Sequence, residues 1–117
     1  MDWKGRTVHS MSLNPGPFVA IKSGRKTVEM RLNDEKRQIV KAGDFIRFCN
    51  LDTNEQLLVK VVDRIVYPSF YELYSEHDKI SIGYTESERA HPSDMLEYYS
   101  EDRIKKYGAL ALVIELV

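Results

Sequence analysis

The sequence predicts an α+β fold in which a small, closed or nearly closed sheet carries short helices. Apolar residues have helical spacing between residues 15 and 23 and then alternate from residue 27, which predicts a helix followed closely by a strand. The last nine residues, ALALVIELV, form an apolar strand without a breaker, suited to the inside of a sheet. A chain of 117 residues can bury one hydrophobic core, so we expect residues 1–117 to form a single domain.

Composition limits the class of protein. Hydrophobic residues make up 43% of the chain and charged residues 30%, a balance typical of a folded and soluble protein. Residues 1–13 lack the apolar run of a signal peptide, and no later run has membrane-spanning length, which predicts a cytoplasmic protein without a membrane partner. The only cysteine, Cys49, lies in the apolar segment FIRFCNL, so we expect a buried thiol and no disulfide.

Charge is distributed unevenly along the chain. The net charge of −1 argues against a protein whose whole surface holds nucleic-acid phosphates. Residues 22–47, however, contain eight basic and four acidic residues, whereas residues 69–102 contain two basic and nine acidic residues. A local basic patch could therefore attract an anion, with the acidic stretch elsewhere or facing it across a cleft.

The first half of the chain predicts one helix and three strands. The helix is entered at Pro15 and Pro17 and stops at Gly24. A strand over residues 27–32 follows, with its apolar side chains toward the core and a polar face made by Thr27, Glu29 and Arg31. A polar loop over residues 33–44 leads to a strand at 44–51, a hairpin connection and a long strand at 56–67, which we expect to be central and buried on most of both faces.

The second half predicts two helices before the final strand. Ser69 and Glu72 have the spacing of a capping box, so a short helix is expected through Tyr74. Residues 75–92 have little periodicity and predict a long, partly ordered loop. One helix is expected over residues 93–108, with Ser93 as its cap and Gly108 as its stop.

Several kinds of chemistry find no support in the sequence. The three histidines have no paired spacing with each other or with the cysteine, which predicts no metal. Neither a phosphate-binding glycine loop nor the serine elbow of hydrolases is present, so we expect no nucleotide cofactor. What remains is Lys26, Thr27, Glu29 and Arg31, whose alternate side chains lie about 7 Å apart on a strand. On local pattern alone, charged strand residues favour a solvated face with cross-strand pairs.

Family resemblance favours a site instead. The segments SLNPGPFVAIKSGRKTVEMRL, VKAGDFIRF and EYYSEDRIKKYGALALVIEL resemble the ASCH-domain family, named for a region of activating signal cointegrators. The resemblance implies a small PUA-like β-barrel with short helices framing a cleft, and RNA or a nucleotide-like small molecule as the partner.

The resemblance also implies roles for individual residues. Gly24 would make the turn, while Arg25, Lys26, Glu29 and Arg31 would line the cleft floor. Lys26 and Arg31 would hold a phosphate or carbonyl, and Glu29 would accept a hydrogen bond from a base amino group. A base could stack on one of three tyrosines, Tyr84, Tyr98 or Tyr99. The alternative is that these rings pack on the barrel.

Some small bacterial relatives are enzymes that deacylate N4-acetylcytidine with a lysine, a threonine three residues later and a glutamate from a later helix. Lys26 matches this pattern, but Glu29 occupies the threonine position, leaving Thr27 as a substitute hydroxyl and Glu97 as the later glutamate. A carboxylate beside Lys26 is no hydroxyl nucleophile, so a binding domain is the first hypothesis. The alternatives are an amidohydrolase acting on an acylated nucleoside, an RNA-cleaving enzyme or a protein-interaction domain; the sequence leaves the oligomeric state open.

Overall fold

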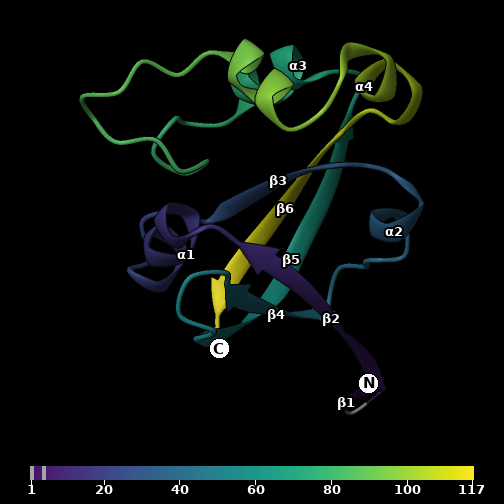
Figure 1. Ribbon diagram of the computed structural model, residues 1–117. Helices are drawn as coiled ribbons and strands as arrows, with labels where there is room; N and C mark the ends of the chain where they lie inside the picture. Colours follow the sequence, from purple (N-terminus) through teal and green to yellow (C-terminus); the bar gives the residue numbers. More distant parts are fainter. Residues whose placement is uncertain (1, 4) are drawn as a thin grey trace.

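A mixed sheet curled into a half-barrel is the main body of the fold, and short helices form a second layer at one end (Figure 1). This arrangement comes from a computed structural model that describes residues 2–3 and 5–117; residues 1 and 4 of the amino-terminal stretch lie outside the described part. The strands are β1 (Asp2–Trp3), β2 (Arg6–Leu13), β3 (Val28–Leu32), β4 (Phe45–Asn50), β5 (Gln56–Tyr67) and β6 (Ala109–Leu116). The helices are α1 (Pro15–Lys22), α2 (Glu35–Gln38), α3 (Phe70–Glu76), the 3₁₀ helix η1 (Pro92–Glu97) and α4 (Glu101–Tyr107).

The sheet has the strand order β1-β2-β4-β5-β6-β3. Strands β2 and β4 run parallel, and the other neighbours are antiparallel. As predicted, the carboxy-terminal apolar segment is a buried strand, because β6 lies between β5 and β3. The inner side of the curl is filled by one apolar cluster from α1, β4, β5 and β6, which includes Phe18, Ile21, Phe48, Val59 and Leu112.

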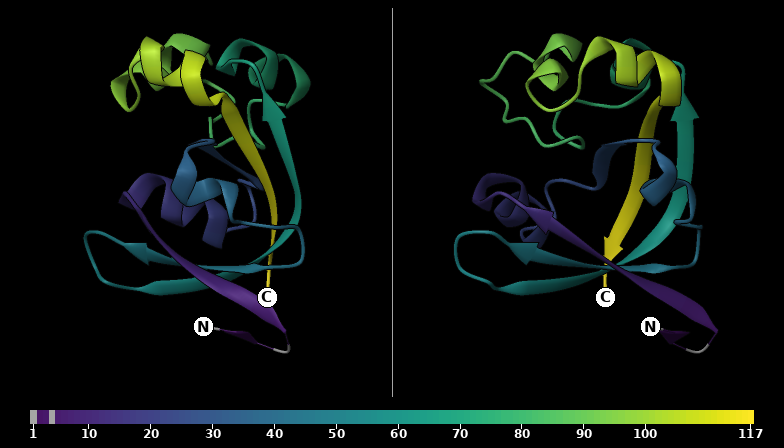
Figure 2. Two further views of the ribbon diagram at one scale, coloured as in Figure 1. Left: turned by 90° about the vertical axis from the view of Figure 1, so that its right-hand side faces the viewer. Right: turned by 45° about the vertical axis from the view of Figure 1, so that its right-hand side comes forward.

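The helical layer rests on a second apolar cluster. Phe70 and Leu73 of α3, Ile82 of the following loop and Met95 of η1 pack with residues of β3 and β6. Figure 2 shows this layer across one end of the strands. The loop also bonds to the sheet, because the Ser81 carbonyl accepts hydrogen bonds from the amides of residues 27 and 28. The layer therefore covers the start of β3, where the candidate site residues lie.

The expectation of one helix over residues 93–108 was wrong. The structure has η1 and α4 instead, with extended backbone at Ser100 between them. The Ser100 hydroxyl accepts a hydrogen bond from the Arg103 amide, and His91 caps η1 in place of Ser93. Serine at this point competes with helix continuation by capping the next turn. The predicted stop at Gly108 is confirmed by its φ of +82°.

The long strand β5 is central, as predicted, but it is not buried on both faces. Val62 and Val66 are about half exposed, at 49% and 47%, because only the concave side of the curled sheet is covered. A register shift between Val61 and Asp63 interrupts its pairing with β6. Cys49 is likewise only partly buried, since it alternates along β4 with the buried Phe48.

Three elements were not predicted: the short strand β1, strand β2 and helix α2. Helix α2 forms within the expected polar loop because the Asp34 side chain accepts a hydrogen bond from the Arg37 amide. Strand β2 was missed although its last four residues, Ser-Met-Ser-Leu, alternate polar and apolar. Its parallel pairing with β4 brings the amino-terminal segment beside the rest of the sheet.

Candidate functional site

A cleft of about 600 Å³ lies between the sheet and the helical layer. Its floor contains Lys26, Glu29 and Arg31, from β3 and the residues just before it. One side is made by the end of β2 and the start of α1, and the opposite wall by the 77–91 loop and η1. The cleft therefore joins segments from both halves of the chain.

A glycine turn delivers Lys26 to the floor. Gly24 has a φ of +82°, a conformation that favours glycine and that lets the chain turn from α1 toward β3. The Lys26 amide then donates to the Ala20 carbonyl at 3.0 Å. The lysine stem runs close under Gly83, because a Cβ added there would lie 3.1 Å from Lys26 Cδ. The backbone of Lys26 is thus fixed to α1, and its stem is fixed beneath the loop at Gly83.

Glu29 is the centre of a buried charged triad. Its Oε1 lies 2.7 Å from Lys26 Nζ, and its Oε2 accepts a hydrogen bond of 2.7 Å from Arg31 Nε. Glu29 is only 3% exposed and Lys26 7%, so the local-pattern expectation of a solvated strand face was wrong. This face lies on the concave side of the sheet, because the β6 partner of Glu29 is Leu112 of the inner apolar cluster. The charges pair because unpaired buried charges are costly.

The two cations control the ionisation of Glu29. Burial alone would raise its pKa, but the charges and hydrogen bonds of Lys26 and Arg31 outweigh burial and hold the pKa below its ordinary value. Glu29 is therefore an anion at neutral pH. It serves as a hydrogen-bond acceptor, and it leaves the triad with one net positive charge.

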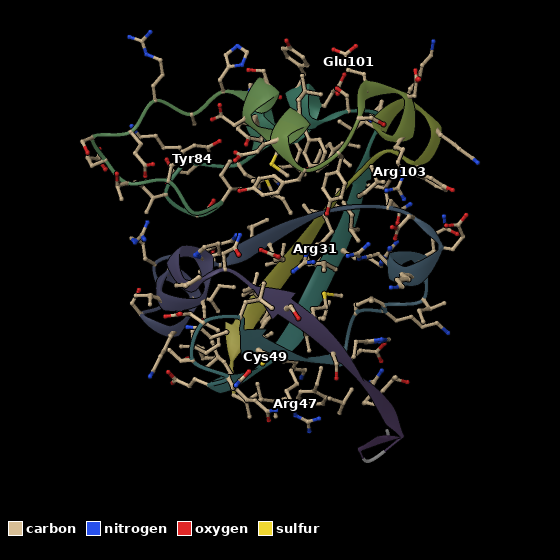
Figure 3. All side chains as sticks on the ribbon, in the orientation of Figure 1. Arg31, Arg47, Cys49, Tyr84, Glu101 and Arg103 are labelled. Atoms are coloured by element: carbon tan, nitrogen blue, oxygen red, sulfur yellow. The ribbon has the colours of Figure 1, made fainter. Side chains whose placement is uncertain are left out.

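Arg31 also connects the two sides of the curled sheet. Its Nη2 donates a hydrogen bond of 3.0 Å to the carbonyl of Ser12 on β2, and β3 and β2 do not pair with each other. Figure 3 shows Arg31 in the space between these two strands. The arginine thus closes part of the open side of the half-barrel with a side chain, where a closed barrel would have a strand pair.

Tyrosines shape the opposite wall. The Tyr84 hydroxyl donates a hydrogen bond of 2.7 Å to Asp94 Oδ2 and lies 2.7 Å from the Tyr74 hydroxyl. Burial, followed by these two hydrogen bonds, raises the pKa of Tyr84. The phenol therefore stays protonated and is not a base at neutral pH. Tyr99 stacks on Phe70, whereas Tyr98 lines the cleft and is 58% exposed.

The cleft is electrically mixed. Three cations line it, and Arg25 among them also donates to the carbonyls of Gly83 and Tyr84, which anchors the loop. Four carboxylates line it as well, three of them on the wall: Glu88, Asp94 and Glu97. The acidic stretch of the sequence thus faces part of the basic stretch across the cleft, one of the two arrangements left open above.

The structure brings most of the sequence-predicted site residues together. Arg25, Lys26, Glu29, Arg31, Tyr84 and Glu97 all line the cleft. Gly24 and Thr27 do not line it; Gly24 shapes the turn, and the Thr27 side chain is exposed. Sequence reasoning missed Ser12, Glu88 and Asp94 as lining residues, because their approach depends on the parallel β2–β4 pair and on the path of the long loop.

Metal ligands and membrane spans were searched within the described ranges 2–3 and 5–117. No group of three or more histidine, cysteine, aspartate or glutamate side chains there has the geometry of a metal site. Within the same ranges, every helix is too short or too polar to cross a bilayer.

Comparison with known families agrees with this architecture. The ASCH domain matches residues 11–117, which is nearly the whole chain. The chain therefore belongs to the ASCH-domain family, and the predicted PUA-like α+β fold is confirmed as a curled half-barrel with short helices. No curated protein is significantly similar in sequence.

Solved structures show the same fold. The hypothetical protein PH0355 is 32% identical, with a TM-score of 0.83 over 95% of this chain and 100% of its own. Protein PF0455 from Pyrococcus furiosus is 30% identical, with a TM-score of 0.75 over 95% of this chain and 98% of its own. A serine-to-alanine mutant of ZmASCH from Zymomonas mobilis is 18% identical, with a TM-score of 0.70 over 94% of this chain and 68% of its own, a likeness of fold.

Proposed function

We propose that this ASCH domain binds RNA or a nucleotide-like small molecule, with one nucleotide unit in the cleft. The observation that carries the proposal is the buried triad of Lys26, Glu29 and Arg31 at the cleft floor. A lysine ammonium group has three donor hydrogens, and among the described residues Lys26 Nζ has one acceptor, Glu29. A ligand carbonyl or phosphate oxygen would satisfy the remaining hydrogens.

The two sides of the cleft suit different parts of a nucleotide. The floor supplies donors from Lys26 and Arg31 and an acceptor from Glu29, which match the carbonyl and amino groups on the edge of a base. The exposed ring of Tyr98 can stack on that base, a contact worth about 1–3 kcal/mol. The wall carboxylates can accept hydrogen bonds from ribose hydroxyls. Their charge disfavours a polyphosphate, so the ligand unit carries little negative charge inside the cleft.

Titration of the protein with the four nucleosides, the four nucleoside monophosphates and short RNA tests the proposal. Binding to at least one of these, lost in Lys26→Met, is expected; the methionine keeps the packed stem and removes the charge. The exposed Lys105, which lies outside the cleft, provides the control Lys105→Met. Absence of binding, or equal binding by both variants, would refute the proposal.

The stacking role of Tyr98 has its own matched control. Tyr98→Ala should weaken binding about tenfold, because a stacked base loses its aromatic partner. Tyr71 is similarly exposed, at 65%, but it is not among the cleft residues, so Tyr71→Ala should leave binding unchanged. Equal effects of the two substitutions would rule out a stacked base at Tyr98.

The hydrolase alternative has less support from the geometry. It needs a hydroxyl nucleophile beside Lys26, and the Thr27 hydroxyl is exposed outside the cleft lining. Glu97 reaches the cleft, but within the described residues its carboxylate has no hydrogen-bond or ion-pair partner that would fix its position. Incubation with N4-acetylcytidine and with labelled RNA decides between the two; turnover lost in Lys26→Met would establish an enzyme.

A further inference from the structure

A second groove of about 590 Å³ adjoins the cleft. Its lining comes from β2, from α2 and the residue after it, from β4 and from the start of β5. Arg31 and Ser12, which are joined by a hydrogen bond, line both the groove and the cleft. In Figure 3, Arg31 lies on one side of β2, and Arg47 and Cys49 lie on the other. The groove therefore begins at Arg31 beside the cleft and crosses β2 toward Arg47 and Cys49 (Figure 3).

The groove is basic, in contrast to the cleft. Four cations line it, Arg31, Lys36, Arg37 and Arg47, and no carboxylate does. Arg31 and Arg37 are paired with Glu29 and Asp34, which are both buried behind the surface. Lys36 and Arg47 have no ion partner among the described residues, so their two charges are uncompensated. An electropositive surface of this kind attracts phosphates.

Arg47 is the more informative of the two cations. Its side chain is half-buried on the outer side of β4, beside Ser10, to which it is paired in the sheet register. A half-buried arginine without a carboxylate retains several unused donors in a planar fork that fits phosphate oxygens. The hydroxyls of Ser10 and Ser12 add donors along the same strand. Ile39, 63% exposed, supplies an apolar contact at the rim.

We propose that this groove binds the phosphodiester backbone of a single-stranded RNA whose neighbouring nucleotide occupies the cleft. The inference rests on the proposed function and extends it, because it makes an RNA segment the ligand in place of a free nucleotide. The division follows the charges: the mixed cleft accepts a base and its ribose, and the basic groove accepts the flanking phosphates. Arg31 stands where the two meet.

Binding of RNA pentamers and of the matching nucleoside monophosphates, measured by titration at several salt concentrations, tests the proposal. At low salt the pentamer should bind at least tenfold more tightly than the monophosphate. The double variant Lys36→Gln/Arg47→Gln should lose this advantage and keep its affinity for the free nucleoside, whose base and ribose occupy the cleft alone. If each lost cation contacts one phosphate, the slope of log K against log salt should fall by about 0.7 per cation.

The control is Arg89→Gln/Lys105→Gln, which removes the same charges at exposed positions outside the cleft and the groove. It should bind the pentamer like the wild type. Circular dichroism checks folding, and Arg47→Lys, which keeps the charge but loses the planar fork, should keep the salt slope and bind the pentamer with an affinity between those of the wild type and Arg47→Gln. If Arg47→Gln fails to fold, Lys36→Gln alone should still lower pentamer affinity and the salt slope, because Lys36 is exposed.

The outcomes separate the two proposals. A pentamer that binds no better than a monophosphate, or a groove variant that binds the pentamer normally, overturns the groove and leaves nucleotide binding in the cleft intact. Absence of binding by both probes removes the proposed function and the groove with it. A pentamer whose affinity depends on Lys36 and Arg47 but not on Lys26 supports the groove and contradicts the role of the cleft.

Discussion

Replacement of Glu29 by glutamine is the sharpest test of the charged triad. Glutamine has nearly the same shape as glutamate. Its single side-chain oxygen can accept a hydrogen bond from one of the two cations, but its amide group, which is a donor, then faces the second cation. Removing one member of a buried charge pair costs about 3–5 kcal/mol. Because Lys26 and Arg31 also line the cleft, where water can reach them, we expect a loss near the lower end, about 3 kcal/mol.

Urea denaturation at pH 7 measures this loss. With a slope of about 2 kcal/mol per molar urea, the unfolding midpoint of Glu29→Gln should fall by about 1.5 M. Glu115 is an exposed glutamate on β6 and provides the matched control, so Glu115→Gln should change the free energy of unfolding by less than about 0.5 kcal/mol. Equal midpoints for the two variants would refute the idea that Glu29 pairs with the buried Lys26 and the partly buried Arg31.

Three further predictions concern the same region. The pKa of Glu29 is lower in the folded than in the unfolded chain, so the stability that its charge contributes is complete at neutral pH. This contribution is lost as the pH falls below about 4.3, the ordinary value for glutamate, and through the folded pKa. The free energy of unfolding, measured in urea at a series of acidic pH values, should therefore fall less steeply in Glu29→Gln than in the wild type. Arg31→Lys keeps the charge but cannot hold both the Glu29 carboxylate and the β2 carbonyl, and it should lower the free energy of unfolding by about 1–2 kcal/mol in urea; an unchanged midpoint would contradict the bridging role. Gly83→Ala should reduce ligand affinity by displacing the Lys26 stem, whereas Gly5→Ala, also at positive φ but in open space outside the cleft, should cost stability without that effect; titration of both variants compares them.

Much of the local structure was predictable because neighbouring residues determine it. Alternation of Val28, Met30 and Leu32 predicted β3, and the proline start with the glycine stop predicted α1. The unbroken apolar run at the end of the chain predicted a buried strand, as found for β6. The break at Ser100 was missed because a serine within an otherwise helical pattern fits either a helix surface or a cap.

The candidate site was predicted only in part. The strand period predicted that Glu29 and Arg31 share one face, and family resemblance predicted that they form a site with Lys26. Whether that face is exposed to solvent or covered could not be predicted from the alternation of polar and apolar residues, because a solvent-exposed strand and a cleft floor have the same alternation. The basic groove was not predicted at all.

The sequence by itself determined most of the helices and strands, the unequal charge of residues 22–47 and 69–102, and the family to which the chain belongs. Only the tertiary structure decided that Glu29 is buried on the concave side of the sheet between Lys26 and Arg31, and that Arg31 lies where the cleft meets the basic groove at β2. The physical reason is that burial and ion pairing depend on which distant segments meet. Here, the loop beyond β5 covers a strand some fifty residues earlier.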